Sequence, residues 1–219
     1  MITLAIDTST TRGAVAVLHD DRPVGEEHFG RDGLFPALEK LNPGQFESIV
    51  VGVGPGSFTG IRAGIAAAKG LALPGRLPVK AISSFDALAL TALPHLPRDC
   101  PQICVLADAR RDEVYFALYD RNANPTHPCR LGALEEIEIH NPIWFISAEM
   151  EKYRDALRET FGGFATICHE PVFPSAAALG WLGRHRASQL PLEPIYLRET
   201  EYKKVAPSPS SPKNKLPQA

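Results

Sequence analysis

A large charge excess is absent from this 219-residue sequence, in which 23 lysines and arginines face 25 aspartates and glutamates. With a net charge of −2, the surface has no overall basic excess to attract phosphates, so strong unaided binding to nucleic acid is not expected. No apolar run approaches the roughly 20 residues that a membrane helix needs, and the first ten residues contain no lysine or arginine. We therefore expect a cytoplasmic protein with no membrane partner.

Motifs of metal-binding and catalytic chemistry are also missing. The seven histidines never lie within four residues of one another, which excludes the helical HxxxH and HExxH zinc motifs. The sequence has no GxSxG segment, which excludes the serine-hydrolase elbow. The four cysteines form no CxxC pair, and we expect buried or free thiols rather than disulfides or metal ligands. The sequence therefore predicts no metal site.

An internal repeat of a strand–turn–strand pattern is present. Residues 2–20, ITLAIDTSTTRGAVAVLHD, contain two apolar strand-like runs, the first of which ends in Asp7. Residues 103–120, ICVLADARRDEVYFALYD, repeat the pattern with Asp108 at the corresponding place. Two such units about a hundred residues apart indicate two lobes of related architecture, although two unrelated hairpins give the same pattern.

Apolar spacing predicts the remaining elements. Further strands are predicted at residues 24–29, 48–53, 78–83 and 143–147. Helices are predicted at residues 34–41, 57–73, 84–93, 149–160 and 175–186. The nearly continuous β-branched run at 48–53 is typical of a strand buried on both faces, so we expect mixed sheets with helices packed over them. Residues 206–219, APSPSSPKNKLPQA, cannot form a core and predict a disordered tail.

The stretch GVGPGSFTGIR, residues 52–62, is rich in glycine, and its first half is typical of a turn. Beyond the turn, Gly60, Gly64 and Ala68 recur every fourth residue and place small side chains on one face of the predicted helix. An interior glycine costs about 0.5–1 kcal/mol of helix propensity relative to alanine, so a closely packed neighbour must offset the loss. That neighbour is either the core of the chain or a partner subunit, and the spacing does not decide between them.

A second hypothesis for the same stretch is an anion cradle at the helix N-terminus. The stretch lacks the lysine of a P-loop and does not match GxGxxG, which disfavours phosphate binding. Asp7 and Asp108 lie where a hairpin offers a carboxylate to a metal ion or phosphate, or where an acid accepts hydrogen bonds from its own turn. The pair Gly162 and Gly163 follows a predicted helix and is interpreted as its C-cap.

Four segments together resemble the bacterial TsaB (YeaZ) family: AIDTST, VGVGPGSFTGIRAGIAAAKGLA, ADARRDEVYFALYD and PIYLRE. The resemblance implies an α/β fold of the actin-like ATPase (ASKHA) superfamily, in which two ribonuclease-H-like lobes with mixed sheets are duplicated. On this basis we place the N-terminal lobe at residues 1–98, the second lobe with a C-terminal return segment at 99–205, and the tail at 206–219.

The resemblance also implies a role in transfer of a threonylcarbamoyl group to the adenosine beside the anticodon of tRNAs that read codons beginning with A. In that system TsaD carries the metal and the transfer chemistry, and TsaE is an ATPase. The chain is then a non-catalytic scaffold without a cofactor, which forms a heterodimer with TsaD and joins TsaE in a larger complex. A homodimer of the lone chain is a further expectation, and contact with tRNA is expected to be indirect.

The pairing surface of the family is a helical bundle made by the first two helices of the N-terminal lobe. Its counterparts here are Leu34, Phe35, Leu38, Leu41, Gly60, Arg62, Gly64 and Ala68. The resemblance makes Asp7, Ser9 and Asp108 degenerate phosphate-loop positions. The first helix is shorter than the usual run of relatives, which predicts a smaller or differently arranged interface. The alternative is an enzyme of the same superfamily, either a nucleotide-dependent phosphotransferase or a metallopeptidase.

Overall fold

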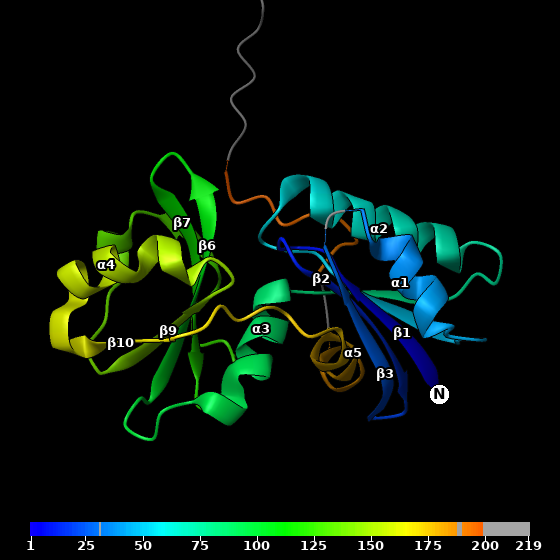
Figure 1. Cartoon of the computed structure of the whole chain (residues 1–219), viewed down its shortest axis with the longest axis horizontal. Helices are drawn as coiled ribbons and strands as arrows, with labels where there is room; N and C mark the ends of the chain where they lie inside the picture. The colour runs from blue at the N-terminus through cyan, green and yellow to red at the C-terminus, as the bar shows by residue number, and fades with distance from the viewer. Residues whose placement is uncertain (31, 188–189, 199–219) are drawn as a thin grey trace, which may run out of the picture.

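Two five-stranded sheets, one in each half of the chain, form the cores of two lobes (Figure 1). The computed structural model describes residues 1–30, 32–187 and 190–198, so the tail predicted at 206–219 lies outside the described residues. In each sheet three strands form an antiparallel meander, and two more strands continue the sheet in parallel beside the first of the three. Both sheets are therefore mixed, as predicted.

The first lobe has the strand order β3-β2-β1-β4-β5. Its strands are β1 (Ile2–Asp7), β2 (Gly13–His19), β3 (Arg22–Phe29), β4 (Ser48–Gly52) and β5 (Val79–Ile82). One face of the sheet is covered by α1 (Leu34–Leu41) and α2 (Phe58–Ala72). Apolar residues of β1 and α2, among them Leu4 and Ile61, belong to one buried cluster on this face.

The second lobe has the strand order β10-β9-β6-β7-β8, which is the order of the first sheet read from its other edge. Its strands are β6 (Gln102–Arg110), β7 (Glu113–Asp120), β8 (Arg130–Gly132), β9 (Ile143–Ser147) and β10 (Ala165–Ile167). One face is covered by α4 (Met150–Phe161). The shared order confirms that the repeated hairpins belong to a duplicated lobe.

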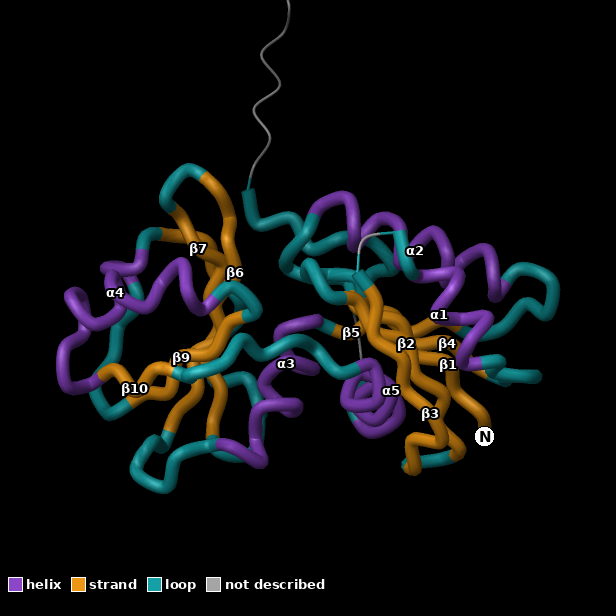
Figure 2. The backbone as a smooth tube through the Cα atoms, in the orientation of Figure 1, coloured by secondary structure: helices purple, strands orange, loops and turns teal. Residues whose placement is uncertain are grey.

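Each lobe places its last helix on the sheet of the other lobe. The helix α3 (Ser84–Ala92) follows β5, yet its Phe85 is buried in one cluster with Ile103 of β6. The helix α5 (Ala176–His185) follows β10, yet its Leu179 is buried with Ala5 of β1. Figure 2 shows both helices between the two sheets. The boundary after residue 98 stays a prediction: it falls between the two sheets in the sequence, and both α3 and α5 pack across it.

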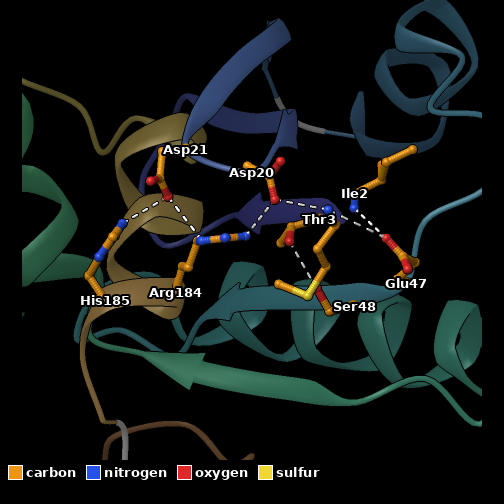
Figure 3. Close-up of polar contacts among 9 residues, drawn as sticks. Ile2, Thr3, Asp20, Asp21, Glu47, Ser48, Arg184 and His185 are labelled. Atoms are coloured by element: carbon orange, nitrogen blue, oxygen red, sulfur yellow. Dashed lines mark hydrogen bonds and ion pairs between the residues drawn. The ribbon is translucent and has the colours of Figure 1, made fainter.

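The helix α5 is bound to the first lobe at both ends. At its N-terminus the backbone N–H of Ala176 donates to Glu26 Oε1 at 2.7 Å. Near its C-terminus Arg184 lies 3.1 Å from the carboxylates of both Asp20 and Asp21, in the turn between β2 and β3 (Figure 3). An acid at the N-terminus and a cation at the C-terminus match the helix dipole, so these contacts stabilise α5 as well as its position.

Residues 190–198, here called the C-terminal segment, connect the two lobes. The backbone N–H of Ile195 donates to the Val53 carbonyl of the first lobe at 2.9 Å. The Arg198 guanidinium lies 2.5 Å from Glu113 Oε2 and donates to the Ala109 carbonyl at 3.0 Å. Both of these partners belong to the β6–β7 hairpin of the second lobe. Figure 1 shows the segment, in orange, passing from beside α2 toward this hairpin.

Several details differ from the sequence prediction or sharpen it. The three-residue strands β8 and β10 are not predicted, because alternation over three residues does not stand out. The strand β6 does not end at Asp108 but continues through an irregular pairing to Arg110. Gly162 has a φ of 52°, and its N–H bonds the Arg158 carbonyl, which confirms the C-cap. The four cysteines are free thiols, and no helix of the described residues is long and apolar enough to cross a membrane.

Candidate functional site

The turn after β1 contains the first predicted acid, Asp7, which is only 1% exposed. Its Oδ1 accepts hydrogen bonds from the Ser9 backbone N–H at 2.9 Å and from the Ser9 hydroxyl at 2.6 Å. These bonds make Asp7 the acid of its own turn, one of the two predicted roles. Its Oδ2 is buried, and none of the described residues forms a hydrogen bond with it. Burial raises the pKa of Asp7, and the hydrogen bonds from Ser9 offset part of that rise.

The small-residue face of α2 packs on this same turn. A Cβ at Gly64 would lie 2.3 Å from Thr8 Oγ1, a Cβ at Gly60 would lie 2.1 Å from the Thr8 carbonyl oxygen, and Ala68 is fully buried. The Thr8 hydroxyl donates to the Gly60 carbonyl at 2.7 Å. Gly64 and Ala68 are thus buried by Thr8 and the core of the same lobe, which is one of the two neighbours that the spacing left open, while Gly60 is half-buried against the Thr8 backbone. The close approach offsets the low helix propensity of the glycines.

The N-terminus of α2 is capped from within the chain. The Ser57 hydroxyl accepts a hydrogen bond from the Gly60 N–H at 3.2 Å, and the Ser57 N–H donates to the Ser9 carbonyl at 2.6 Å. A Cβ at Gly56 would lie 2.2 Å from that same carbonyl oxygen. The glycine-rich turn thus brings the start of α2 onto the turn after β1.

Asp108, the corresponding acid of the second lobe, has different neighbours. Its carboxylate lies 2.8 Å from Lys152 Nζ and 3.1 Å from an Arg110 guanidinium nitrogen, and it accepts the Arg110 backbone N–H at 2.8 Å. Burial alone would raise the pKa of Asp108, but Lys152 and Arg110 outweigh burial and lower it. The structure thus brings Asp7 and Ser9 into one turn, and it places Asp108 with its own cations on the other sheet.

The outer faces of α1 and α2 are the remaining candidate site. The side chains of Leu34 and Leu38, predicted as partner contacts, instead hold α1 on the sheet with 9% and 8% exposure. Leu41 is partly buried against the same core. Phe35 is 61% exposed, and Arg62 is also exposed. Among the predicted partner contacts, Phe35 and Arg62 are the two that solvent reaches freely.

Two aromatic rings hold Arg62 on the outer face of α2, and we call Phe58, Arg62 and Tyr196 the Arg62 cluster. The guanidinium carbon lies 3.7 Å from the Phe58 ring centroid, and Arg62 Nε donates to the Tyr196 hydroxyl at 2.9 Å. The two rings are 5.9 Å apart and are 55% and 52% exposed. Exposed aromatic residues with an arginine are the side chains that protein interfaces favour.

Phe58 and Tyr196 are site residues that the sequence alone does not predict. The i, i+4 spacing of Phe58 and Arg62 was the available signal for one side of the cluster. Tyr196 is 134 positions from Arg62, so no local pattern connects them. Across the described residues, no group of three or more histidine, cysteine, aspartate or glutamate side chains is placed to hold a metal ion.

Comparison with known protein sequences shows which family this chain resembles. A family model described as TsaD, tRNA N6-adenosine threonylcarbamoyltransferase, matches residues 37–128. A relative from Bacillus subtilis (strain 168), called tRNA threonylcarbamoyladenosine biosynthesis protein TsaB, is 30% identical over 226 residues, which is 92% of this chain and 96% of the relative. The chain belongs to the TsaB family. This confirms the resemblance that the four sequence segments indicate.

Solved structures support the TsaB-family fold. YeaZ from Pseudomonas aeruginosa has a TM-score of 0.71 at 22% identity, covering 89% of this chain and 99% of YeaZ. The activator of the 2-hydroxyisocaproyl-CoA dehydratase from Clostridium difficile, solved with bound ADPNP, has a TM-score of 0.50 at 11% identity, covering 84% and 94% of the two chains. These likenesses concern the fold alone, and they confirm the two-lobe α/β architecture of the actin-like ATPases.

Proposed function

We propose that this TsaB-family chain is a non-catalytic subunit that pairs with TsaD in the biosynthesis of threonylcarbamoyladenosine in tRNA. The observation that carries the proposal is the outer face of α1 and α2, which exposes Phe35 and the Arg62 cluster. The name of the Bacillus subtilis relative and the match to the TsaD family model support the choice of pathway and partner.

The exposed rings explain how such a face would bind a subunit. Phe35, Phe58 and Tyr196 are each more than half exposed, so their apolar area is still available for burial. Burial is worth roughly 25 cal/mol per Å² of apolar surface, and aromatic and arginine side chains dominate interface energies. The short α1 exposes one phenylalanine rather than a long apolar stripe, which agrees with the smaller or differently arranged interface that the sequence predicts.

A supporting role also agrees with the two hairpin acids. Asp7 is closed into a turn by Ser9, and Asp108 is paired with Lys152 and Arg110. Asp108 and one oxygen of Asp7, Oδ1, are thus bonded within their own lobes. In this proposal TsaD performs the transfer, TsaE joins the larger complex in the cytoplasm, contact with tRNA is indirect, and the lone chain forms a homodimer through the same face.

The test is a charge placed on the α1 part of the proposed face, at the exposed Phe35. We expect Phe35→Asp to weaken pairing with the same organism's TsaD about tenfold or more, because it puts a carboxylate where an apolar contact forms. Pairing is measured by co-purification and calorimetry, and the threonylcarbamoyladenosine content of tRNA by mass spectrometry. The matched control is Phe164→Asp, since Phe164 is 53% exposed on the second lobe.

Because Phe35 is largely exposed, the variant is expected to keep the circular dichroism spectrum of the wild type. Equal pairing of Phe35→Asp and wild type would remove this face from the proposal. A reconstituted modification reaction that runs equally well without the chain, or turnover of substrate by the chain alone, would overturn the proposed role itself.

A further inference from the structure

A groove lies beside the Arg62 cluster, between α2 and the C-terminal segment. Its volume is about 230 Å³. Ile65 and Ala66 line it from α2, and Leu192 and Pro194 line it from the segment. The two walls are thus apolar and come from parts of the chain more than a hundred residues apart. Since the segment is bonded to both lobes, through Ile195 and Arg198, the second wall is fixed in place.

Two cations edge this apolar groove. Arg62 and Lys69 both line it, and they lie seven residues apart, which is about two turns along the same side of a helix. In the part of the chain that the structure describes, neither forms an ion pair. Glu193 is the acid among the lining residues, so the lining carries two positive charges and one negative. The groove therefore favours an anionic occupant.

Arg62 is already held in the position that such an occupant would use. The Phe58 ring lies under its guanidinium, and the Tyr196 hydroxyl accepts its Nε–H, which leaves the remaining N–H groups as donors. An arginine that is ordered before binding loses less side-chain entropy on association than a free one. Tyr196 is thus a positioning residue for Arg62, and it is supplied by the same segment that forms the groove's second wall.

We propose that this groove binds an acidic segment of the TsaD partner, with an apolar side chain between α2 and Leu192 and a carboxylate on Arg62 or Lys69. The inference deepens the proposed function and rests on it, because it assigns a chemistry to the partner's surface. It adds the C-terminal segment to the docking face, which the sequence analysis places on α1 and α2 alone.

The test is charge reversal at the groove. We expect Arg62→Glu with Lys69→Glu to lower the affinity for purified TsaD about 100-fold, because like charges across an interface cost several kcal/mol. The matched control is Arg130→Glu with Arg158→Glu, which changes the net charge equally at exposed positions of the second lobe. Binding is measured by calorimetry at 50 to 500 mM NaCl. The wild-type affinity is expected to fall more steeply with salt than that of the reversed variant.

Two milder variants separate positioning from charge. Tyr196→Phe removes the hydroxyl that holds Arg62 and keeps the ring, so we expect an affinity loss of about threefold. Lys69→Gln keeps a long polar side chain without the charge, and we expect it to reduce the salt dependence of binding. Either variant also serves if the double reversal fails to fold, because each changes one exposed side chain conservatively.

The outcomes are distinguishable. If wild type and Phe35→Asp both fail to bind TsaD, the proposed function is wrong. If TsaD binds wild type and the reversed variant with equal affinity and equal salt dependence, the function stands and the groove inference is overturned. If the reversal changes self-association of the chain and leaves TsaD binding intact, the occupant is a second copy, and the inference is likewise overturned.

Discussion

The two hairpin acids occupy corresponding places in a duplicated fold, and their surroundings have opposite electrostatic character. Asp7 is buried beside glycines and hydroxyls, and one of its oxygens has no hydrogen-bond partner in the part of the chain that the structure describes. Asp108 is surrounded by the cations Lys152 and Arg110. The pKa of Asp7 is raised and that of Asp108 is lowered. Strand order has been preserved between the lobes, whereas the environment of the acid has not.

The difference comes from the residues that each lobe packs against its hairpin acid. In the first lobe, Gly52 of β4 lies directly against the acid, since a Cβ there would be 2.0 Å from Asp7 Oδ2, and the glycines of α2 pack on the neighbouring Thr8. In the second lobe, α4 contributes Lys152, so the largely buried carboxylate of Asp108 is paired with a cation. The repeat therefore preserves the strand order and the position of the acid, while the residues packed against each acid decide its charge environment.

The largest change in unfolding free energy is expected from Gly64→Ala. This substitution disturbs the close packing of α2 on the turn after β1. Its new Cβ would lie 2.3 Å from Thr8 Oγ1. Overpacking of this kind typically costs about 1–3 kcal/mol of unfolding free energy, measurable as a lower urea midpoint. Gly70→Ala on the same helix is the control, because no atom lies within 4 Å of its Cβ. We expect that control to be stabilised by up to about 1 kcal/mol, and a stable Gly64→Ala would contradict the packing described here.

A smaller change in unfolding free energy, in the stabilising direction, is expected from Asp7→Asn. Because the folded-state pKa of Asp7 is raised, its contribution is most favourable below its ordinary value of 3.8 and is lost as the pH rises through the folded value. Asparagine keeps the acceptor for Ser9 and removes the buried charge, so the variant should be more stable than wild type by about 1–2 kcal/mol at pH 7. Urea unfolding from pH 3.5 to 7 should show the two proteins converging in acid. Lower stability of the variant at pH 7 would refute this.

The smallest effect is expected from Asp108→Asn, with the reverse dependence on pH. Because the folded-state pKa of Asp108 is lowered, the carboxylate stabilises the folded state at pH values above the ordinary pKa of 3.8. This stabilisation is lost as the pH falls through the folded-state pKa. The partner Lys152 is about half exposed, so solvent screening limits the loss to below about 1 kcal/mol at pH 7. Urea unfolding over the same pH range measures this loss of stability, with Lys152→Gln as the matched variant. If the stability of the Asp7 and Asp108 variants relative to wild type changed with pH in the same direction, the electrostatic contrast between the two acids would be refuted.

The sequence predicts most of the elements because they are long and periodic. Apolar spacing identifies α1 at residues 34–41 and β9 at residues 143–147 with their observed bounds. The small-residue face of α2 is also predicted, because four-residue spacing places Gly60 and Gly64 on one side. The neighbour of that face is not predicted, because periodicity shows which residues share one side of a helix and does not identify what packs on that side.

Contacts between segments that are distant in the chain could not be predicted from the sequence. An amphipathic α5 is predicted, but nothing in its pattern says that Leu179 packs on the first sheet rather than the second. Tyr196 lies in the PIYLRE segment that marks the family resemblance, yet its hydrogen bond to Arg62 spans most of the chain. Both contacts depend on the relative placement of the two lobes, which local propensity does not encode.

The exchange of α3 and α5 between lobes has a consequence for synthesis. The inner face of the first sheet is covered by α5, the last helix of the described chain to leave the ribosome. Domains usually fold in the order in which they are made, but here the half made first keeps an uncovered apolar surface until its partner has been translated. Nascent chains stalled near residue 98 should therefore depend on chaperones, and the two halves should reach their native state together.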